Sequence, residues 1–234
     1  MENATRLYLV PTPIGNLEDI TLRALRILNE VDTILAEDTR TTGVLLKHHN
    51  INNDLKSYHI HNEHQQVQHI VDQLKDGKVM ALVSDAGTPG ISDPGFLIVR
   101  ECIKAGIQIE CLPGATAFVP AIVKSGIPCD RFIFEGFLPH KKGKKTKLEM
   151  ISESQVPVVC YESPHRLLKT LQQIGDIMGK ERIVSVSREL TKIYEESITD
   201  SVEEVLNYFE EKGVKGEIVL IVSAKPNKNK SNEP

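Results

Sequence analysis

The sequence predicts an α/β protein of two domains, the first built on a mainly parallel, doubly wound sheet. Short apolar runs alternate with longer segments that have the period of an amphipathic helix. Such alternation is typical of parallel strands joined by crossover helices that cover both faces of the sheet. The alternation restarts after about residue 115, which predicts a second α/β domain.

In the first half, each apolar run is followed by a segment of helical period. The expected strands are 6–10, 33–38, 55–59, 78–85 and 107–112, and the expected helices are 21–31, 41–48, 63–76 and 94–105. The run at 78–85 is the clearest of these strands, and the run at 55–59 is the weakest.

The second half begins with an expected helix over 114–126. The strands expected after it are 131–137, 156–163, 182–189 and 216–222, and the helices are 144–153, 165–178 and 201–212. A boundary near 115–128 gives domains over 1–118 and 119–224. The remaining tail, 225–234, is polar and free of aromatic residues, so we expect it to be disordered.

Composition excludes several classes of protein. No stretch reaches the about 18 to 20 apolar residues of a membrane span, and the start lacks a basic region followed by an apolar run. We therefore expect a cytoplasmic protein without membrane contact. The four cysteines form no CxxC pair, so we expect reduced, mostly buried thiols and no metal site. With a net charge of -4, a nucleic-acid partner would have to meet a local basic patch.

Three glycine- and proline-rich loops follow expected strands of the first half, at 10–16, 84–95 and 112–117. Ligands of an open α/β sheet bind outside the carboxyl ends of its strands, where these loops lie. Glycine and proline often mark ordinary turns, but three such loops at one edge favour a ligand site. The third loop also opens the helix expected from residue 114, whose free N–H groups can hold an anion.

The nature of the ligand follows less directly. There is no GxGxxG after the first strand and no GxxxxGK[ST], which disfavours a dinucleotide or a nucleoside triphosphate. Asp85, at the end of a central strand, suits a ribose diol or an ammonium group. A flat apolar slot between proline and glycine backbones suits adenine.

Charged residues follow the second and third strands at the same edge. Glu37, Asp38 and Arg40 end the second strand. Asp38 or Thr39 could simply cap the next helix, while Arg40 could pair with a phosphate through two N–H groups. In HNEH (61–64), His61 and Glu63 could contact RNA, or the segment could only start a helix, because Asn-x-x-Gln (62–65) resembles a capping box.

The second half carries two further charged segments. YESPHR (161–166) contributes Glu162, His165 and Arg166 as candidates for acceptor binding. HKKGKKTK (140–147) holds five lysines in eight residues. Such a run is either a solvated loop or a contact for RNA phosphates whose strength depends on salt.

Taken in order, nine segments resemble the class III, tetrapyrrole-methylase-like methyltransferases. They are VPTPIGNLEDIT, AEDTR, HNE, VSDAGTPGISDPG, LPGATA, FEGFLP, YESPHR, SREL and GEIVLIV, and the resemblance as a whole runs from about Leu7 to Val222. They are similar specifically to the 16S ribosomal RNA (cytidine-2′-O)-methyltransferase I family. PTPIGN and SDAG stand where tetrapyrrole enzymes usually carry a glycine-rich loop and a GDP-type turn, which favours the RNA branch.

The resemblance implies an S-adenosylmethionine-dependent enzyme that methylates a cytidine 2′-oxygen of 16S ribosomal RNA in the 30S subunit. It also implies a homodimer, and a cofactor held in a cleft between the two halves. The residues that it assigns to the cofactor are Ile14, Gly15, Asp85, Ala86, Gly87, Thr88, Ser92, Thr116, Ala117, Tyr161, Leu190 and Glu217.

The sequence does not single out one catalytic base. A 2′-hydroxyl is a poor nucleophile until its proton is removed, so a nearby base should help. The candidates are Glu37, Asp38, His61, Glu63 and Glu162. The residues expected to bind the RNA are Arg40, Lys141, Lys142, Lys144, Lys145, Lys147, His165 and Arg166. Two alternatives are a methyltransferase for corrin-pathway tetrapyrroles and a non-catalytic module that binds RNA or a nucleotide.

Overall fold

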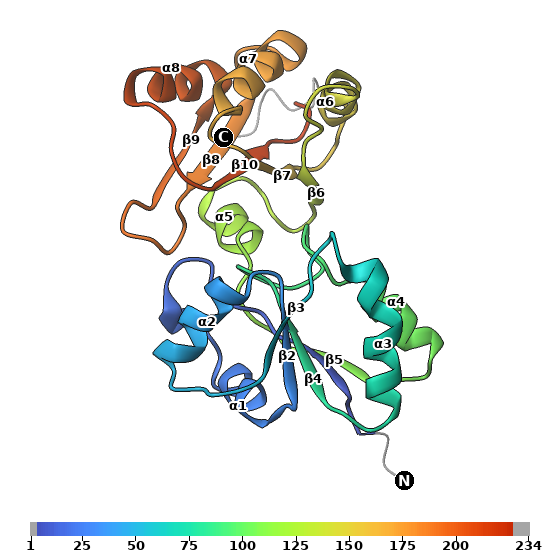
Figure 1. Ribbon diagram of the computed structural model, residues 1–234. Helices are drawn as coiled ribbons and strands as arrows, with labels where there is room; N and C mark the ends of the chain where they lie inside the picture. The colour runs from blue at the N-terminus through green and yellow to red at the C-terminus, as the bar shows by residue number, and fades with distance from the viewer. Residues whose placement is uncertain (1–3, 227–234) are drawn as a thin grey trace. The chain divides into compact units, whose positions relative to one another are not determined.

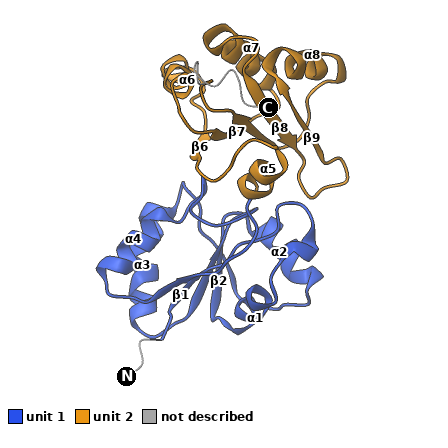
Figure 2. Ribbon diagram, turned by 180° about the vertical axis from the view of Figure 1, so that it is seen from behind, with its two compact units in different colours: residues 1–116 blue, residues 117–234 orange. Residues whose placement is uncertain are grey.

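The computed structural model describes residues 4–226 and divides into two compact units, Met1–Thr116 and Ala117–Pro234 (Figure 2). Residues 227–234 of the tail expected to be disordered lie outside the described residues. The first tail residue, Lys225, is tied to the second unit, because its backbone N–H donates to the Ser154 carbonyl at 2.7 Å.

The first unit contains a parallel sheet of five strands, as the sequence predicted. Its strands are β1 (Leu7–Leu9), β2 (Thr33–Ala36), β3 (Leu55–Ser57), β4 (Met80–Val83) and β5 (Ile109–Cys111). They lie in the order β3-β2-β4-β1-β5, and every neighbouring pair is parallel. All five carboxyl ends therefore lie at one edge of the sheet.

Helices cover both faces of this sheet (Figure 1). The helices are α1 (Leu22–Glu30), α2 (Thr39–His48), α3 (Glu63–Lys75) and α4 (Phe96–Lys104), with a short 3-10 turn at Leu17–Asp19. Along β4, Ala81 and Val83 pack with α1 and α2, while Met80 and Leu82 pack with α3 and α4. Right-handed crossovers explain this division, because the chain crosses the sheet in one direction from β1 to β3 and in the other from β3 to β5.

Strand β4 lies between β2 and β1, whose following helices cover the face opposite to its own helix. A crevice forms at the carboxyl ends of neighbouring strands whose connections depart to opposite faces. The loop after β4 therefore lies at the switch point of the sheet, which is the place where an open α/β sheet binds its ligand.

The second unit has a mixed sheet. Its strands are β6 (Ile133–Phe137), β7 (Val158–Glu162), β8 (Ile183–Arg188), β9 (Glu196–Ser201) and β10 (Ile218–Val222), in the order β6-β7-β10-β8-β9. Only β6 and β7 pair in parallel. Strand β9 was not expected, because ESITDS is a polar edge strand without an apolar run.

Three helices, α6 (Lys144–Ser152), α7 (Leu167–Met178) and α8 (Val202–Lys212), share one core with alternate residues of β7, β8 and β10. The short helix α5 (Phe118–Lys124) lies near β7 and β10 on the other face (Figure 1). Helix α5 begins four residues later than the sequence suggested. The segment 114–117 is therefore a loop, and its N–H groups are not those of a helix start.

The α/β class and the parallel first sheet are thus confirmed. All four cysteines are free, but Cys111 and Cys129 are exposed, so the expectation of mostly buried thiols is wrong for half of them. Within residues 4–226, no helix combines the length and apolarity that crossing a membrane requires.

Candidate functional site

The loops after β1 and β4 are joined by backbone hydrogen bonds. Thr12 and Gly87 form an isolated antiparallel bridge in which each N–H donates to the other's carbonyl at 2.9 Å. The Thr12 hydroxyl donates to the Ser84 carbonyl at 3.0 Å, and the Ser84 hydroxyl donates to the Gly87 carbonyl at 3.2 Å. The two loops therefore form one rigid piece of backbone at the carboxyl edge of the sheet.

The loop after β5 is held against the same piece. The Thr88 hydroxyl donates to the Ala115 carbonyl at 3.1 Å. A Cβ on Gly114 would lie only 2.6 Å from the Pro11 side chain, so the proline ring packs against the Gly114 backbone at a distance that leaves no room for a side chain at residue 114. Gly87 has a φ of 83°, a left-handed value that glycine adopts without strain. The glycines and prolines of these loops therefore serve the contacts between the loops as well as the turns themselves.

Five cofactor residues predicted from the first-unit loops lie at this edge with different exposure. Ile14 and Gly87 are buried, and a Cβ on Gly87 would meet the Ile14 side chain at 3.6 Å. Gly15, Asp85 and Ala86 are exposed. An apolar floor with an acidic rim fits a ligand that has a flat apolar part and a cationic or hydroxyl-bearing part.

Asp85 connects this edge to the end of β2. Its Oδ1 accepts a hydrogen bond from the Asp38 backbone N–H at 3.1 Å. Although the residue as a whole is exposed, partial desolvation of its carboxyl raises the pKa of Asp85. The hydrogen bond from the Asp38 N–H opposes this rise, and the Asp38 carboxylate adds to it. Ser92, farther along the same loop, adopts a left-handed φ of 66°, which is uncommon for a residue with a side chain.

Glu37 and Asp38, the two candidate bases at the end of β2, have opposite electrostatic surroundings. Asp38 caps α2 by accepting from the Arg40 N–H at 2.8 Å, and the Arg40 guanidinium lowers its pKa to about 2. Burial and then Asp85 raise the pKa of Glu37. A base works best when its pKa approaches the working pH, so this contrast favours Glu37.

Asp93 joins the same carboxylates from the end of the β4 loop. Burial, then Glu37 and then Asp85 raise its pKa from 3.8 to about 7. This aspartate belongs to the 84–95 loop, and no role was predicted for it. His59 also acts on Glu37, because its charge lowers the Glu37 pKa. The carboxylates of β2 and β4 therefore form an acidic cluster, Glu37, Asp38, Asp85 and Asp93.

The segment after β3 folds differently from the expected capping box. Asn62 makes no side-chain cap for α3. Its Oδ1 accepts from the His59 N–H at 2.8 Å, and its amide donates to the Ser57 carbonyl at 3.3 Å. The side-chain capping box is therefore absent, and Asn62 closes the turn before the helix. The helix start itself is confirmed, because α3 begins at Glu63. His61 is exposed, and its N–H donates to His59 Nδ1 at 3.2 Å.

In the second unit, the predicted cofactor residues also gather at one edge of a sheet. Tyr161 lies near the end of β7, Leu190 follows β8, and Glu217 precedes β10, which runs antiparallel to both strands. Leu190 is buried, whereas the Glu217 carboxylate is exposed and pairs with Lys192 at 2.9 Å. Register therefore brings the three residues to the same end of the sheet.

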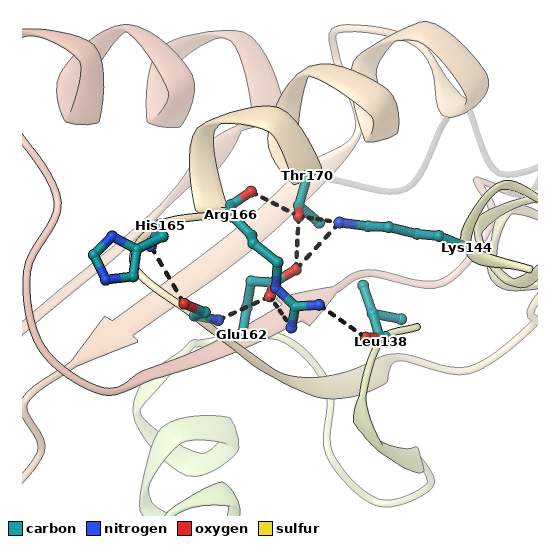
Figure 3. Close-up of polar contacts among 7 residues, drawn as sticks. Leu138, Lys144, Glu162, His165, Arg166 and Thr170 are labelled. Carbon is teal, nitrogen blue, oxygen red and sulfur yellow. Dashed lines mark hydrogen bonds and ion pairs between the residues drawn. The ribbon is translucent and has the colours of Figure 1, made fainter. Parts of the chain in front are cut away.

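Glu162 is buried in a polar network and does not fit the role of a base (Figure 3). Its Oε1 pairs with Arg166 at 2.6 Å and accepts from the Ser163 N–H at 2.8 Å. Its Oε2 accepts from the Thr170 hydroxyl at 2.6 Å and faces Lys144 Nζ at 3.4 Å. Both oxygens are engaged inside the unit, which disfavours Glu162 as the base.

The same network corrects the expectation for Lys144. This side chain is buried, and its ammonium donates to the Thr170 hydroxyl at 2.6 Å (Figure 3). Burial lowers the pKa of Lys144, an effect that the Glu162 carboxylate opposes. Lys144 therefore holds α6 against α7 and cannot reach a phosphate. Lys141, Lys142 and Lys145 are exposed, while Lys147 pairs with Glu135 at 2.9 Å.

Arg166 and His165 are placed differently although they are adjacent. Arg166 is mostly buried, and besides Glu162 it donates to the Leu138 carbonyl at 3.2 Å, which fastens the end of β6. The Arg166 guanidinium is thus occupied by Glu162 and by the Leu138 carbonyl inside the unit, which disfavours its predicted role in RNA binding. His165 is exposed on the loop that Glu162 holds.

A substitution of Lys144 separates a structural role from RNA binding. Lys144→Met removes the ammonium but keeps most of the side-chain volume. We expect the free energy of unfolding to fall by about 3 kcal/mol, because the substitution breaks a buried ion pair. This value is at the lower end of the usual range, since Glu162 keeps its pair with Arg166. The control, Lys145→Met, removes an exposed lysine and should change it by less than about 0.5 kcal/mol. Equal urea midpoints for the two variants would contradict the buried network.

Asp93 should make stability depend on pH. Its pKa is about 7 in the folded chain and 3.8 in an ordinary environment, so the folded chain retains a proton that the unfolded chain has lost. Stability should therefore fall as pH rises from about 4 to about 7. Asp93→Asn should flatten this fall, measured as urea midpoints across that range, whereas Asp76→Asn, on an exposed turn, should not. The idea is wrong if the Asp93 variant keeps the wild-type slope.

Comparisons with known proteins support the resemblance that the sequence motifs indicated. The family model described as Tetrapyrrole (Corrin/Porphyrin) Methylases matches residues 6–206. Solved structures with the same fold include the methyltransferase CobJ, with a TM-score of 0.71, 16% identity and coverage of 94% of this chain and 95% of that one. Another is a Thermus thermophilus uroporphyrin-III C-methyltransferase complexed with S-adenyl homocysteine, with a TM-score of 0.64, 19% identity and coverage of 93% and 97%.

Curated relatives are far more similar in sequence. Proteins named ribosomal RNA small subunit methyltransferase I match from Haemophilus influenzae at 47% identity, covering 97% of this chain and 81% of the relative, and from Escherichia coli O157:H7 at 49%, covering 93% and 77%. The Thermotoga maritima protein of that name is 46% identical, with 94% and 99% covered. The chain therefore belongs to the ribosomal RNA small subunit methyltransferase I family, within the tetrapyrrole methylases.

Proposed function

We propose that this protein transfers the methyl group of S-adenosylmethionine to the 2′-oxygen of a cytidine in 16S ribosomal RNA. The proposal rests on one observation. The loops after β1, β4 and β5 are joined by hydrogen bonds at the switch point of a parallel sheet, and the loop after β4 carries Asp85. Membership of the small-subunit methyltransferase family supports the RNA as acceptor.

The first unit offers the chemical groups that S-adenosylmethionine requires. Ile14 and the backbone around Gly87 supply an apolar wall suited to adenine, and Asp85 suits the ribose hydroxyls or the ammonium group. The acidic cluster favours a ligand with positive charge. To the same cofactor we assign Gly15, Ala86, Thr88, Ser92, Thr116, Ala117, Tyr161, Leu190 and Glu217.

When bound, S-adenosylmethionine supplies an already activated methyl group, so the protein has to align the acceptor oxygen and remove its proton. The raised pKa of Glu37 supports it as the base that accepts this proton. Asp38 is disfavoured because Arg40 stabilises its charged form. His61 and Glu63, which follow β3 at the same edge, remain candidates for this role or for contacts with the acceptor.

The acceptor RNA would meet exposed cations from both units. Arg40 is 89% exposed at its side chain, and Lys141, Lys142, Lys145 and His165 are also exposed. We further propose action in the cytoplasm on the 30S subunit, and a homodimer, which the resemblance implies and light scattering would test.

The methyl-transfer reaction itself is the direct test. Incubation with S-adenosylmethionine labelled in its methyl group and 30S subunits or naked 16S RNA should label one cytidine, at a position that resists alkaline cleavage because its 2′-oxygen is blocked. Glu37→Gln should lower kcat by about 10²- to 10⁴-fold with little change in RNA affinity.

Other outcomes would select an alternative. Label on a tetrapyrrole precursor and none on RNA would favour the corrin-pathway enzyme. Binding of cofactor or RNA without transfer to any acceptor would favour the non-catalytic module.

Exposed lysines of the 140–147 segment should make RNA binding sensitive to salt. Changing Lys141, Lys142 and Lys145 to Ser should weaken RNA binding and flatten its salt slope by about 2, because each neutralised phosphate contributes roughly 0.7 to 0.9 to that slope. Filter binding over a range of salt concentrations measures both quantities.

The matched control changes Lys47, Lys75 and Lys104 to Ser, exposed lysines at the opposite edge of the first sheet. Both triple variants lose the same charge. If they weaken binding equally, the effect is one of net charge and the segment is a solvated loop.

A further inference from the structure

Strand β6 contains a bulge that changes which side chains share a face. Phe134 pairs with Val159 and Gly136 with Cys160, so Glu135 is an extra residue in the β6–β7 ladder. Gly136 has a φ of 65°, a left-handed value suited to glycine at a bulge. The bulge is therefore fixed by the sequence Glu-Gly at this position.

The bulge places two phenylalanines on the face that carries Tyr161. Side chains alternate along a regular strand, so residues three apart, such as Phe134 and Phe137, would point to opposite faces. With the extra residue, both rings contact Tyr161, at centroid distances of 5.1 Å and 5.4 Å. Phe118, at the start of α5, extends the row at 4.7 Å from Phe134.

Phe137 is the outermost ring of this aromatic row. It lies on the edge strand of the sheet, and 57% of it is exposed, whereas Phe134 and Tyr161 are partly buried. An exposed aromatic ring contributes less to folding than a buried one. Its edge-on contact with Tyr161 limits its freedom, so Phe137 presents a flat apolar surface that is held in place.

Positive charge follows this ring directly along the chain. Leu138 and Pro139 lead into His140, Lys141 and Lys142, three residues that are all exposed. The start of this segment is fixed, because Arg166 donates to the Leu138 carbonyl at 3.2 Å and is itself paired with Glu162 (Figure 3). An aromatic ring held in place, with lysines a few residues along the chain, is a combination with which proteins bind unpaired nucleotides, by stacking on the base and pairing with the phosphate.

We propose that Phe137, backed by Tyr161 and placed by the bulge at Glu135, is a stacking platform for an unpaired base of the RNA substrate. This inference rests on the proposed function. It assigns to the second unit a contact with a nucleobase that is separate from the phosphate contacts of the lysines. A protein partner would use the apolar ring but has no need of the cations that follow it along the chain.

Substitutions of Phe137 test the platform against another exposed ring, that of Phe96. Phe137→Leu should weaken binding of single-stranded oligocytidine RNA by about 5- to 100-fold, the range for loss of one stacked base. Phe137→Tyr, which keeps the ring, should bind within about twofold of the wild type by the same argument. Phe96→Leu, at a ring that is 70% exposed on α4, should also bind as the wild type does. S-adenosylmethionine affinity should be unchanged in all three variants.

A fluorescent reporter gives an independent readout, because the chain contains no tryptophan. The emission of a Phe137→Trp variant should be quenched by oligocytidine RNA and much less by the same RNA annealed to its complement. A Phe96→Trp variant should respond to neither. Equal quenching at the two positions would overturn the platform.

The outcomes separate this inference from the function on which it rests. If the wild type methylates 30S subunits and Phe137→Leu binds the RNA normally, the platform is wrong and the proposed function stands. If the wild type neither binds nor methylates any ribosomal RNA, both are wrong. Binding of a protein by the exposed ring, with RNA affinity unaffected by its loss, would also overturn the platform.

Discussion

The backbone bridge between Thr12 and Gly87 is the interaction on which the arrangement of the loops at the carboxyl edge of the first sheet depends. It joins the loop after β1 to the loop after β4, two strands that are already neighbours in the sheet. Gly87 makes this bridge with a left-handed φ, so a residue with a side chain there would be strained whatever space surrounds it. A rigid pair of loops keeps Asp85 in position without help from a bound ligand. Preorganisation of this kind reduces the entropy lost on binding.

The second unit uses a polar network for the same purpose. Glu162 is buried at the end of β7 and holds three elements at once, through Lys144 of α6, Thr170 of α7 and the Arg166 brace to the end of β6. Buried charges are costly unless they are paired and hydrogen-bonded, and here each oxygen of Glu162 has at least two partners. The network fixes the loop of His165 and the segment after Phe137 together.

The net charge of -4 does not show that charges of opposite sign are clustered in different places, an acidic cluster in the first unit and exposed lysines in the second. The carboxylates at the ends of β2 and β4 favour a cationic ligand, while the exposed lysines after β6 favour phosphates. The acidic cluster would repel an RNA backbone brought directly against it. Arg40 lies within this cluster and neutralises Asp38, which lowers that repulsion where an acceptor nucleotide would approach. In the proposed function, the acidic cluster faces the cationic cofactor and the exposed lysines after β6 face RNA phosphates.

The sequence by itself determined the α/β class, the order of nearly all strands and helices, and the three loops at the carboxyl edge of the first sheet. These features are encoded locally, in hydrophobic period and in the positions of glycine and proline. Tertiary structure alone decided that Lys144 is buried against Glu162, that Asp93 lies near Glu37, and that a bulge brings Phe137 to Tyr161. The physical reason is that these contacts depend on register and on distant segments meeting, and a charge or a ring has the same local sequence signature whether it is paired, buried or exposed.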